Sequence, residues 1–208
     1  MECKTGMSIL IRDVSEHELD AVLALNNAAG HSILPMNRDQ LGFFFDCAAY
    51  FRVGLIDGAL AGFLIALTED ADHASANFRW FKQRFERFLY IDRIVIAKGH
   101  RGAGLGRIFY ADLQSFAEVR SPRIACEVFL EPGNDIALLF HGTYGFSEVG
   151  QQVMPEVERR VSLLTKDLCS WPWVQQTYYS ADRSRLPELP WLACRPHRTG
   201  VARQATGS

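Results

Sequence analysis

The sequence predicts a single domain of mixed α/β class. Its 208 residues are 48% hydrophobic and 22% charged, which is ordinary for a globular chain with one sizeable core. Apolar segments with strand and helix periodicity follow one another as strand, two helices, three strands, helix, strand, helix and two strands. This order is not a regular parallel βαβ series, so we expect a mixed sheet.

The N-terminal half begins with a strand and two helices. Residues 8–14 alternate loosely and predict the first strand. Ser15 is typical of a helix N-cap, with Glu18 as its capping-box partner, and a helical apolar face continues to Asn27. A loop is expected over 30–36 and a second helix over about 38–49.

A hairpin follows, with strands over 51–56 and 61–67 on either side of the turn signal Asp57-Gly58. Residues 68–76 are polar. Residues 78–88 are aromatic and basic, with helical spacing that suits plain packing. The same Phe, Trp and Arg side chains are also suited to covering a pocket or binding a flat, anionic group.

The second half predicts strands over 90–96, 124–130, 146–153 and 157–164, with helices over 107–119 and 135–143. The domain is expected to span 8–168, after an N-terminal extension over 1–7. Beyond it, 169–208 is rich in Pro, Arg and Trp. We expect that segment to be poorly ordered or to lie as a strap over the domain.

Charge and cysteine usage argue against several classes of protein. A net charge of −2 gives no electrostatic case for nucleic-acid binding, and no apolar run reaches the length of a membrane span. The five cysteines include no Cys-x-x-Cys pair, so neither a metal site nor a disulfide framework is indicated. Free thiols suit a reducing cytoplasm, which is the expected location.

The glycine-rich stretch 101–106, Arg-Gly-Ala-Gly-Leu-Gly, lies between the strand over 90–96 and the following helix. Glycines allow close approach of the backbone, and the N–H groups of a first helical turn attract an anion. No Gly-Lys-Ser/Thr closes the stretch, and the third glycine of a dinucleotide fingerprint would fall at Phe109. The pattern therefore predicts a different phosphate loop.

The arrangement Arg-x-x-Gly-x-Gly after a strand resembles the pyrophosphate loop of the GNAT superfamily of N-acetyltransferases. A second segment agrees: residues 134–146 match five of the six positions of the family pattern Asn-x-x-Ala-x-x-Phe-Tyr-x-x-x-Gly-Phe, with His141 in place of Tyr. The resemblance covers about 8–166. It implies a twisted sheet of about seven strands, flanked by four or five helices and splayed between strands 4 and 5.

The resemblance also implies acetyl-CoA as co-substrate. Its pantetheine arm would lie along Ile94, Val95 and Ile96. Its pyrophosphate would bind backbone N–H groups of the loop and first helical turn, with two arginine side chains adding charge or merely forming a solvated helix cap. These residues are Arg101, Gly102, Ala103, Gly104, Leu105, Gly106 and Arg107.

Three residues of the second segment are also candidates. Asn134 is expected to cap the short helix and, by resemblance, to contact the pantetheine arm. Phe140 is a core residue beside the cofactor. His141 occupies the position of the family's usual general acid, so it is a candidate proton donor to the thiolate. Alternatively it hydrogen-bonds the cofactor sulfur or has no task, and Tyr144 partly shares its helix face.

Two carboxylates in the splayed strands are candidates for the general base. Strand alternation predicts that Tyr90, Asp92, Ile94 and Ile96 share one face, and a carboxylate in an apolar strand is costly unless paired or used. Asp92 is the first candidate; the alternative is a buried ion pair near Arg93 or with Arg123. Glu127 is the second candidate. The two carboxylates could instead bind a cationic amine.

The leading hypothesis is an acetyl-CoA-dependent N-acetyltransferase that acts on a primary amine of a small or amino-acid-like molecule. Competing hypotheses are a noncatalytic acyl-CoA-binding or regulatory module on the same fold, and a protein N-terminal or lysine acetyltransferase. The bulky segment 78–88 argues mildly against an open peptide groove. Many members of this family dimerise, so a homodimer is one expectation.

Overall fold

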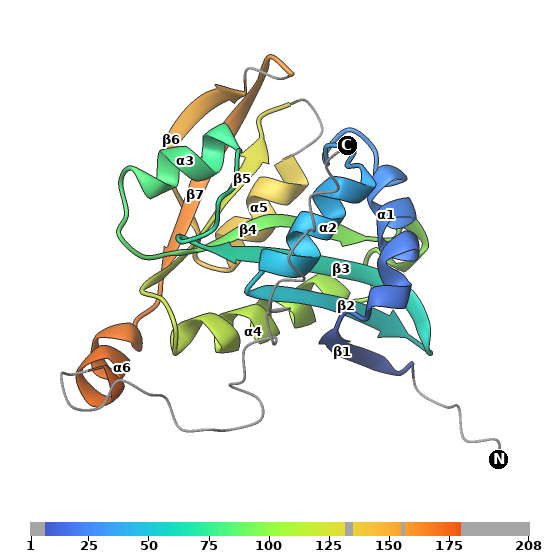
Figure 1. Ribbon diagram of the computed structural model, residues 1–208, viewed down its shortest axis with the longest axis horizontal. Coiled ribbons are helices and arrows are strands. Elements are labelled where there is room, and N and C mark those ends of the chain that lie inside the picture. Colours follow the sequence, from blue (N-terminus) through green and yellow to red (C-terminus); the bar gives the residue numbers. More distant parts are fainter. Residues whose placement is uncertain (1–6, 132–134, 155–156, 180–208) are drawn as a thin grey trace, which may run out of the picture.

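A seven-stranded mixed sheet forms the centre of the protein in the computed structural model, which describes residues 7–131, 135–154 and 157–179 (Figure 1). The strand order is β1-β2-β3-β4-β5-β7-β6. Neighbouring strands are antiparallel except β4 and β5, which are parallel. The strands are β1 (Ile9–Asp13), β2 (Tyr50–Ile56), β3 (Ala59–Thr68), β4 (Leu89–Ile96), β5 (Arg123–Phe129), β6 (Ser147–Met154) and β7 (Arg159–Asp167).

Helices cover both faces of this sheet. All seven predicted strands and four predicted helices are present, and the mixed α/β class is confirmed. Two further helices, α3 and α6, lie in segments that we did not predict as helices. The helical elements are η1 (Glu16–Glu18), α1 (Leu19–Asn27), α2 (Arg38–Cys47), α3 (Ala76–Lys82), η2 (Lys98–His100), α4 (Leu105–Glu118), α5 (Asp135–Thr143) and α6 (Trp171–Tyr178).

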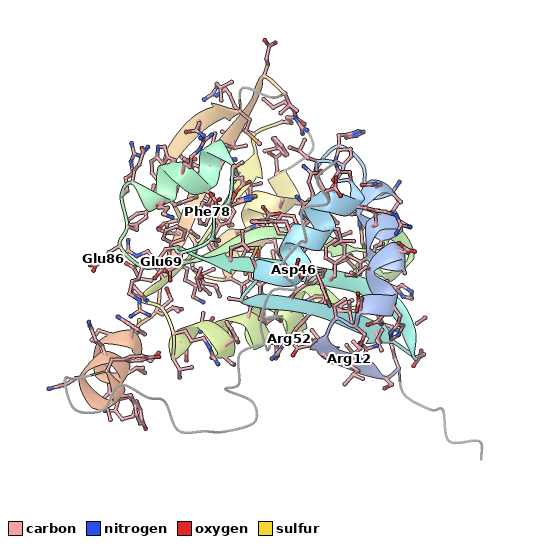
Figure 2. All side chains as sticks on the ribbon, in the orientation of Figure 1. Arg12, Asp46, Arg52, Glu69, Phe78 and Glu86 are labelled. Carbon is pink, nitrogen blue, oxygen red and sulfur yellow. The ribbon has the colours of Figure 1, made fainter. Side chains whose placement is uncertain are left out.

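The two faces bury separate hydrophobic cores. Helices α1, α2 and α3 pack over one face, where Val22, Phe44 and Phe78 belong to a single cluster (Figures 1 and 2). Helices α4 and α5 pack against the other face through residues such as Phe109 and Phe140. Each buried apolar side chain contributes about 1.5–3 kcal/mol, so the two layers fix the positions of the strands between them.

Local sequence signals explain the first elements. The Asp57-Gly58 turn has φ values of +50° and +81°, as the two-residue hairpin requires. Glu18 accepts a hydrogen bond from the backbone N–H of Ser15 at 2.9 Å, which confirms the predicted capping interaction. The same carboxylate pairs with Arg12 at 2.7 Å. These two contacts of Glu18 fix where α1 begins relative to β1.

The aromatic segment 78–88 serves mainly as packing. Its first part belongs to α3, and Phe78, Phe81 and Phe88 are all buried in the core under α1 and α2. The plain packing interpretation therefore holds for these three rings. The cationic side chain of Arg84 lies outside this core, 3.8 Å from the ring centroid of Trp80.

Helix α6 lies within 169–208, the segment expected to be poorly ordered or to form a strap. Trp171 and Val174 are buried, and the guanidinium of Arg87 lies 4.9 Å from the ring centroid of Trp171. Tyr179 donates a hydrogen bond to the carbonyl of Val119 at 3.1 Å. The start of the segment is therefore packed on the domain, whereas 180–208 lies outside the described residues.

Candidate active site

Strands β4 and β5 separate in the middle of the sheet. Their ladder pairs only Leu89–Ile91 with Ile124–Cys126. On its other side β4 pairs with β3, but the register shifts: Ile91 faces Ala66 and Arg93 faces Ile65, which leaves Asp92 as an extra residue. Such a bulge bends a strand and increases its twist. The predicted splay is therefore present, and it begins at Asp92.

The bulge also changes which side chains share a face. Tyr90 and Val95 belong to the core under α1, α2 and α3, whereas Ile94 and Ile96 pack against the core under α4 and α5. The prediction that Tyr90, Asp92, Ile94 and Ile96 share one face is wrong, because one extra residue reverses the alternation that follows it.

The glycine loop has the backbone conformation that its sequence suggests. Gly102 and Gly104 have φ values of +84° and +87°, and helix α4 begins directly after them. The N–H groups of Leu105 and Gly106 belong to the first turn of α4. N–H groups in a first helical turn have no carbonyl within the helix to donate to. Among the described residues, no heavy atom apart from the glycine and its chain neighbours lies within 4 Å of where a Cβ would stand on Gly102 or Gly104. The loop therefore fits a pyrophosphate.

A close contact with the sheet fixes the start of α4. The side chain of Leu105 is buried, and a Cβ on Gly54 of β2 would stand 2.7 Å from its Cδ1. Gly62 of β3 is in similarly close contact, since a Cβ there would stand 2.7 Å from the carbonyl oxygen of Val95. The absence of side chains at these two positions lets the helix and β4 approach the hairpin closely.

The other predicted cofactor residues lie around this loop. The Nε of Arg101 donates to the carbonyl of Ile96 at 3.3 Å, and its Nη2 donates to the carbonyl of Ala29 at 3.5 Å, so its side chain folds over the end of β4. Arg107 is exposed on the first turn of α4. The backbone N–H of Ala103 binds the carbonyl of His100 at 3.3 Å. Contact of these residues with phosphate stays a prediction.

Asp92 lies in a buried ion-pair cluster. Its Oδ2 is 2.6 Å from Nε of Arg93, and its Oδ1 is 2.9 Å from Nε2 of His73. Burial alone would raise the pKa of Asp92, but Arg93 and His73 together lower it to about 2. Of the two predicted ion-pair partners Arg93 is the one in contact, since Arg123 pairs with Asp167. Asp92 is ionised at neutral pH.

Glu127 has the opposite character. It lies in β5 just beyond the end of the β4 ladder, and its Oε2 accepts a hydrogen bond from the hydroxyl of Tyr90 at 2.5 Å. Burial raises its pKa to about 7, the negative charge of Asp92 adds to the increase, and the hydrogen bond from Tyr90 opposes it. Two neighbouring carboxyl groups with such separated pKa values can take different roles. Glu127 is suited to exchange a proton near neutral pH.

Sequence reasoning missed two polar side chains beside these carboxyl groups. His73 comes from the β3–α3 connection, and its ring stacks on Phe43 with 6.0 Å between centroids. Asn77 lies near the start of α3 and is fully buried. Both precede β4 in a polar segment with no motif, so only the fold brings them to Asp92 and Glu127.

His141 is buried between α4 and α5. Its Nε2 is 2.6 Å from the hydroxyl of Tyr110, and its Nδ1 is 2.7 Å from the carbonyl of Ala137. A neutral ring that donates from Nδ1 and accepts at Nε2 satisfies both contacts. Burial lowers the pKa of His141, which keeps it neutral. Phe140 packs edge-on against Tyr110 at 4.9 Å, and Asn134 lies outside the described residues.

Arg159 links the end of β5 to the connection between α1 and α2. The guanidinium of Arg159 in β7 forms two hydrogen bonds with the carboxylate of Glu131 and lies 3.6 Å from the ring centroid of Phe129. Its Nη1 also donates to the carbonyl of His31, in the α1–α2 connection, at 2.7 Å. The connection is thereby held against the strands beyond the splay.

Within the part of the chain that the structure describes, none of the helices combines the length and the hydropathy of a membrane span. No group of three or more histidine, cysteine, aspartate or glutamate side chains is arranged there to hold a metal ion.

Solved structures with the same fold include acetyltransferases. The chain is similar to the ribosomal-protein-S18-alanine N-acetyltransferase from Escherichia coli, with 15% identity, a TM-score of 0.59, and coverage of 77% of this chain and 94% of that one. It is similar to smu.2055 from Streptococcus mutans UA159, with 17% identity, a TM-score of 0.61, and coverage of 76% and 99%. Naa50 from Arabidopsis thaliana, solved with the bisubstrate analogue CoA-Ac-MVNAL, gives 14% identity, a TM-score of 0.58, and coverage of 77% and 99%.

No curated protein sequence matches the chain. The model of the acetyltransferase (GNAT) family matches residues 17–146, which run from η1 through the glycine loop to the end of the second motif. The splayed strands β4 and β5 and the glycine loop lie within this range. The chain therefore belongs to the GNAT acetyltransferase family.

Proposed function

We propose that this protein transfers the acetyl group of acetyl-CoA to a primary amine of a small or amino-acid-like acceptor, with Glu127 as the general base. The observation that carries the proposal is the position of Glu127. It lies where β4 and β5 separate, bound to Tyr90, with a pKa of about 7. A base with a pKa near the working pH is the most effective.

We assign different roles to the carboxylates of Glu127 and Asp92. An amine attacks the thioester only when it is neutral, so a proton must leave the ammonium form, and Glu127 accepts it. The pKa of Asp92 is held near 2, so it is a poor proton acceptor at neutral pH. Its charge is already compensated by Arg93, and its other oxygen is in contact with His73. We therefore assign Asp92 to shaping the electrostatics of the site, in place of its first assignment as base.

Acetyl-CoA would bind along the exposed part of β4 and at the start of α4. When bound, it supplies the reactive thioester. Backbone groups of Ile94, Val95 and Ile96 lie beyond the end of the β4–β5 ladder, where an extended arm can pair with them. The open glycine loop would hold the pyrophosphate. His141 has both ring nitrogens engaged, so the proposal includes no acid at that position.

The surroundings of Glu127 support a small acceptor. The contact between Arg159 and His31 ties the α1–α2 connection to β7. Apolar side chains from the α1–α2 connection and from the β6–β7 end of the sheet also belong to one core, namely Ile33, Met154 and Val157. A polypeptide chain would need these contacts to open. A compact amine would not need a groove that continues past them.

Calorimetry and a CoA-release assay test the proposal. Acetyl-CoA is titrated first, and CoA release is then measured against amines, amino acids, polyamines and peptides. Release with a small amine, lost in Glu127→Gln while acetyl-CoA affinity is kept, is expected. Release with peptides alone would favour a protein acetyltransferase, and binding without release would favour a noncatalytic module. We also propose a cytoplasmic location. Sedimentation of the purified protein would test for a homodimer.

A further inference from the structure

A fully buried amide stands next to the proposed base. Asn77 is near the start of α3, and its Oδ1 accepts a hydrogen bond from Nε2 of Gln152 in β6 at 2.9 Å. In this contact the carbonyl side of the Asn77 amide faces Gln152. The Nδ2 group is left on the other side, and it is buried without a hydrogen-bond partner. A buried unpaired donor is costly and calls for an explanation.

The orphan donor lies close to Glu127. It is not within bonding geometry, yet the Asn77 side chain is among the groups that lower the pKa of Glu127. A donor lowers the pKa of a carboxyl group when it stabilises the ionised form. Hydrogen bonds at catalytic groups are often long before the substrate complex forms. The amide is therefore poised to bind the carboxylate once Glu127 is ionised.

The contact between α3 and β6 holds this amide in place. Trp80 of α3 packs directly on Gly150 of β6, where a Cβ would stand 2.7 Å from its Cζ2. Asn77 and Gln152 form a polar contact between the same two elements. Helix α3 is thereby packed against β6, the edge strand of the sheet.

We propose that Gln152 and Asn77 form a hydrogen-bonded chain that positions Glu127 for proton transfer, with Asn77 donating to its carboxylate. This inference rests on the proposed role of Glu127 and adds a positioning residue to it. Tyr90 holds the carboxyl group from β4, and Asn77 holds it from α3. Between them the carboxylate is fixed from two elements, and its orientation does not depend on one hydrogen bond.

Other charged and titratable groups also act on Glu127. Asp92 on β4 raises its pKa, whereas His73 from the β3–α3 connection and Tyr90 lower it. Cys126, its neighbour on β5, is buried, and burial raises the pKa of that thiol, which stays neutral. A test must therefore change the amide alone and leave these groups in place.

Infrared titration of the protonated carboxyl group of Glu127 provides the test without turnover. The band is assigned by its loss in Glu127→Gln, and its midpoint is compared in the cofactor-free wild type and in Asn77→Leu, which keeps the size but removes the donor. We expect the midpoint to rise by about 1 pH unit. Gln152→Leu should raise it less, because the amide loses only its orientation. Gln151→Leu, exposed on the same strand, is the matched control and should not move it.

Once an acceptor is known, the acid limb of the kcat/KM profile should move to higher pH by the same amount in Asn77→Leu. An unchanged midpoint in a folded Asn77→Leu protein would overturn the proposal. If Asn77→Leu does not fold, an unchanged midpoint in Gln152→Leu would overturn it. Failure of the proposed function would appear differently, as absence of CoA release from the wild type while the infrared midpoints still separate.

Discussion

Replacing Glu127 by Gln should make the protein more stable relative to wild type as the pH rises. The unfolded carboxyl group titrates near 4.5, and the folded one near 7. The folded state therefore holds this proton more tightly than the unfolded state does. Wild type gains stability from Glu127 below the unfolded value and loses it as pH rises through the folded value. Glutamine does not titrate, so the variant lacks this loss.

The size of the effect follows from the separation of the two pKa values. About 2.5 units correspond to roughly 3 kcal/mol, because one unit is worth about 1.36 kcal/mol. Asp92 does not contribute in the same window. Its folded pKa lies below the unfolded one, so its stabilising effect is lost only in acid, as pH falls from about 3.8 to about 2.

Denaturant unfolding at several pH values from about 5 to about 8 measures the difference between the two proteins. The stability of wild type minus that of Glu127→Gln should fall by most of the roughly 3 kcal/mol over this range. Parallel stability curves for the two proteins would refute the reasoning. They would mean that Glu127 has an ordinary pKa and is not desolvated at the splay.

The remaining predictions concern the loop, the buried histidine and the arginine at the end of β5. Gly104→Trp should abolish acetyl-CoA binding in calorimetry, because the indole would fill the open space beside the loop. Circular dichroism should stay native, because the strain of a side chain at a φ of +87° costs only about 1–2 kcal/mol. Retained affinity would remove the phosphate-loop assignment. Tyr110→Phe leaves Nε2 of His141 without its donor and should lower the free energy of unfolding by about 1–3 kcal/mol, and an unchanged stability would mean that the pair is not formed. Arg159→Ala should speed amide hydrogen exchange over 28–37, and unchanged exchange would show that the contact with His31 does not hold that connection.

Patterns that are local in the sequence predicted the framework well. The turn at Asp57-Gly58, the cap at Glu18 and the glycine loop each follow from residues a few positions apart, and each has the expected geometry. Helix α3 was not predicted as a helix because it is short and begins in a polar stretch. Its stability comes from burying Phe78 and Phe81 against the sheet, which is a tertiary effect.

The candidate site was less accessible to sequence reasoning. Asp92 and Glu127 stood out as carboxylates in apolar strands, but their ranking as base depended on partners from distant segments. His73 is brought to Asp92 by the β3–α3 connection, and the proposed partner of Glu127, Asn77, belongs to α3. The face on which Tyr90 lies was predicted from simple alternation, and the bulge at Asp92 reversed that alternation beyond it.

Because of the bulge at Asp92, the number of residues in β4 decides which face of the sheet each later side chain takes. An apolar replacement of Ile94 or Val95 keeps each side chain in its own core. Removing Asp92 would delete only the extra residue, because Ile91 and Arg93 already face consecutive residues of β3, Ala66 and Ile65. A library of single-residue deletions should therefore keep each later side chain of β4 in its own core when position 92 is lost, whereas loss of Ile94 would bring Val95 to the opposite face. An alignment that places a gap at position 92 joins residues that face the same side of the sheet.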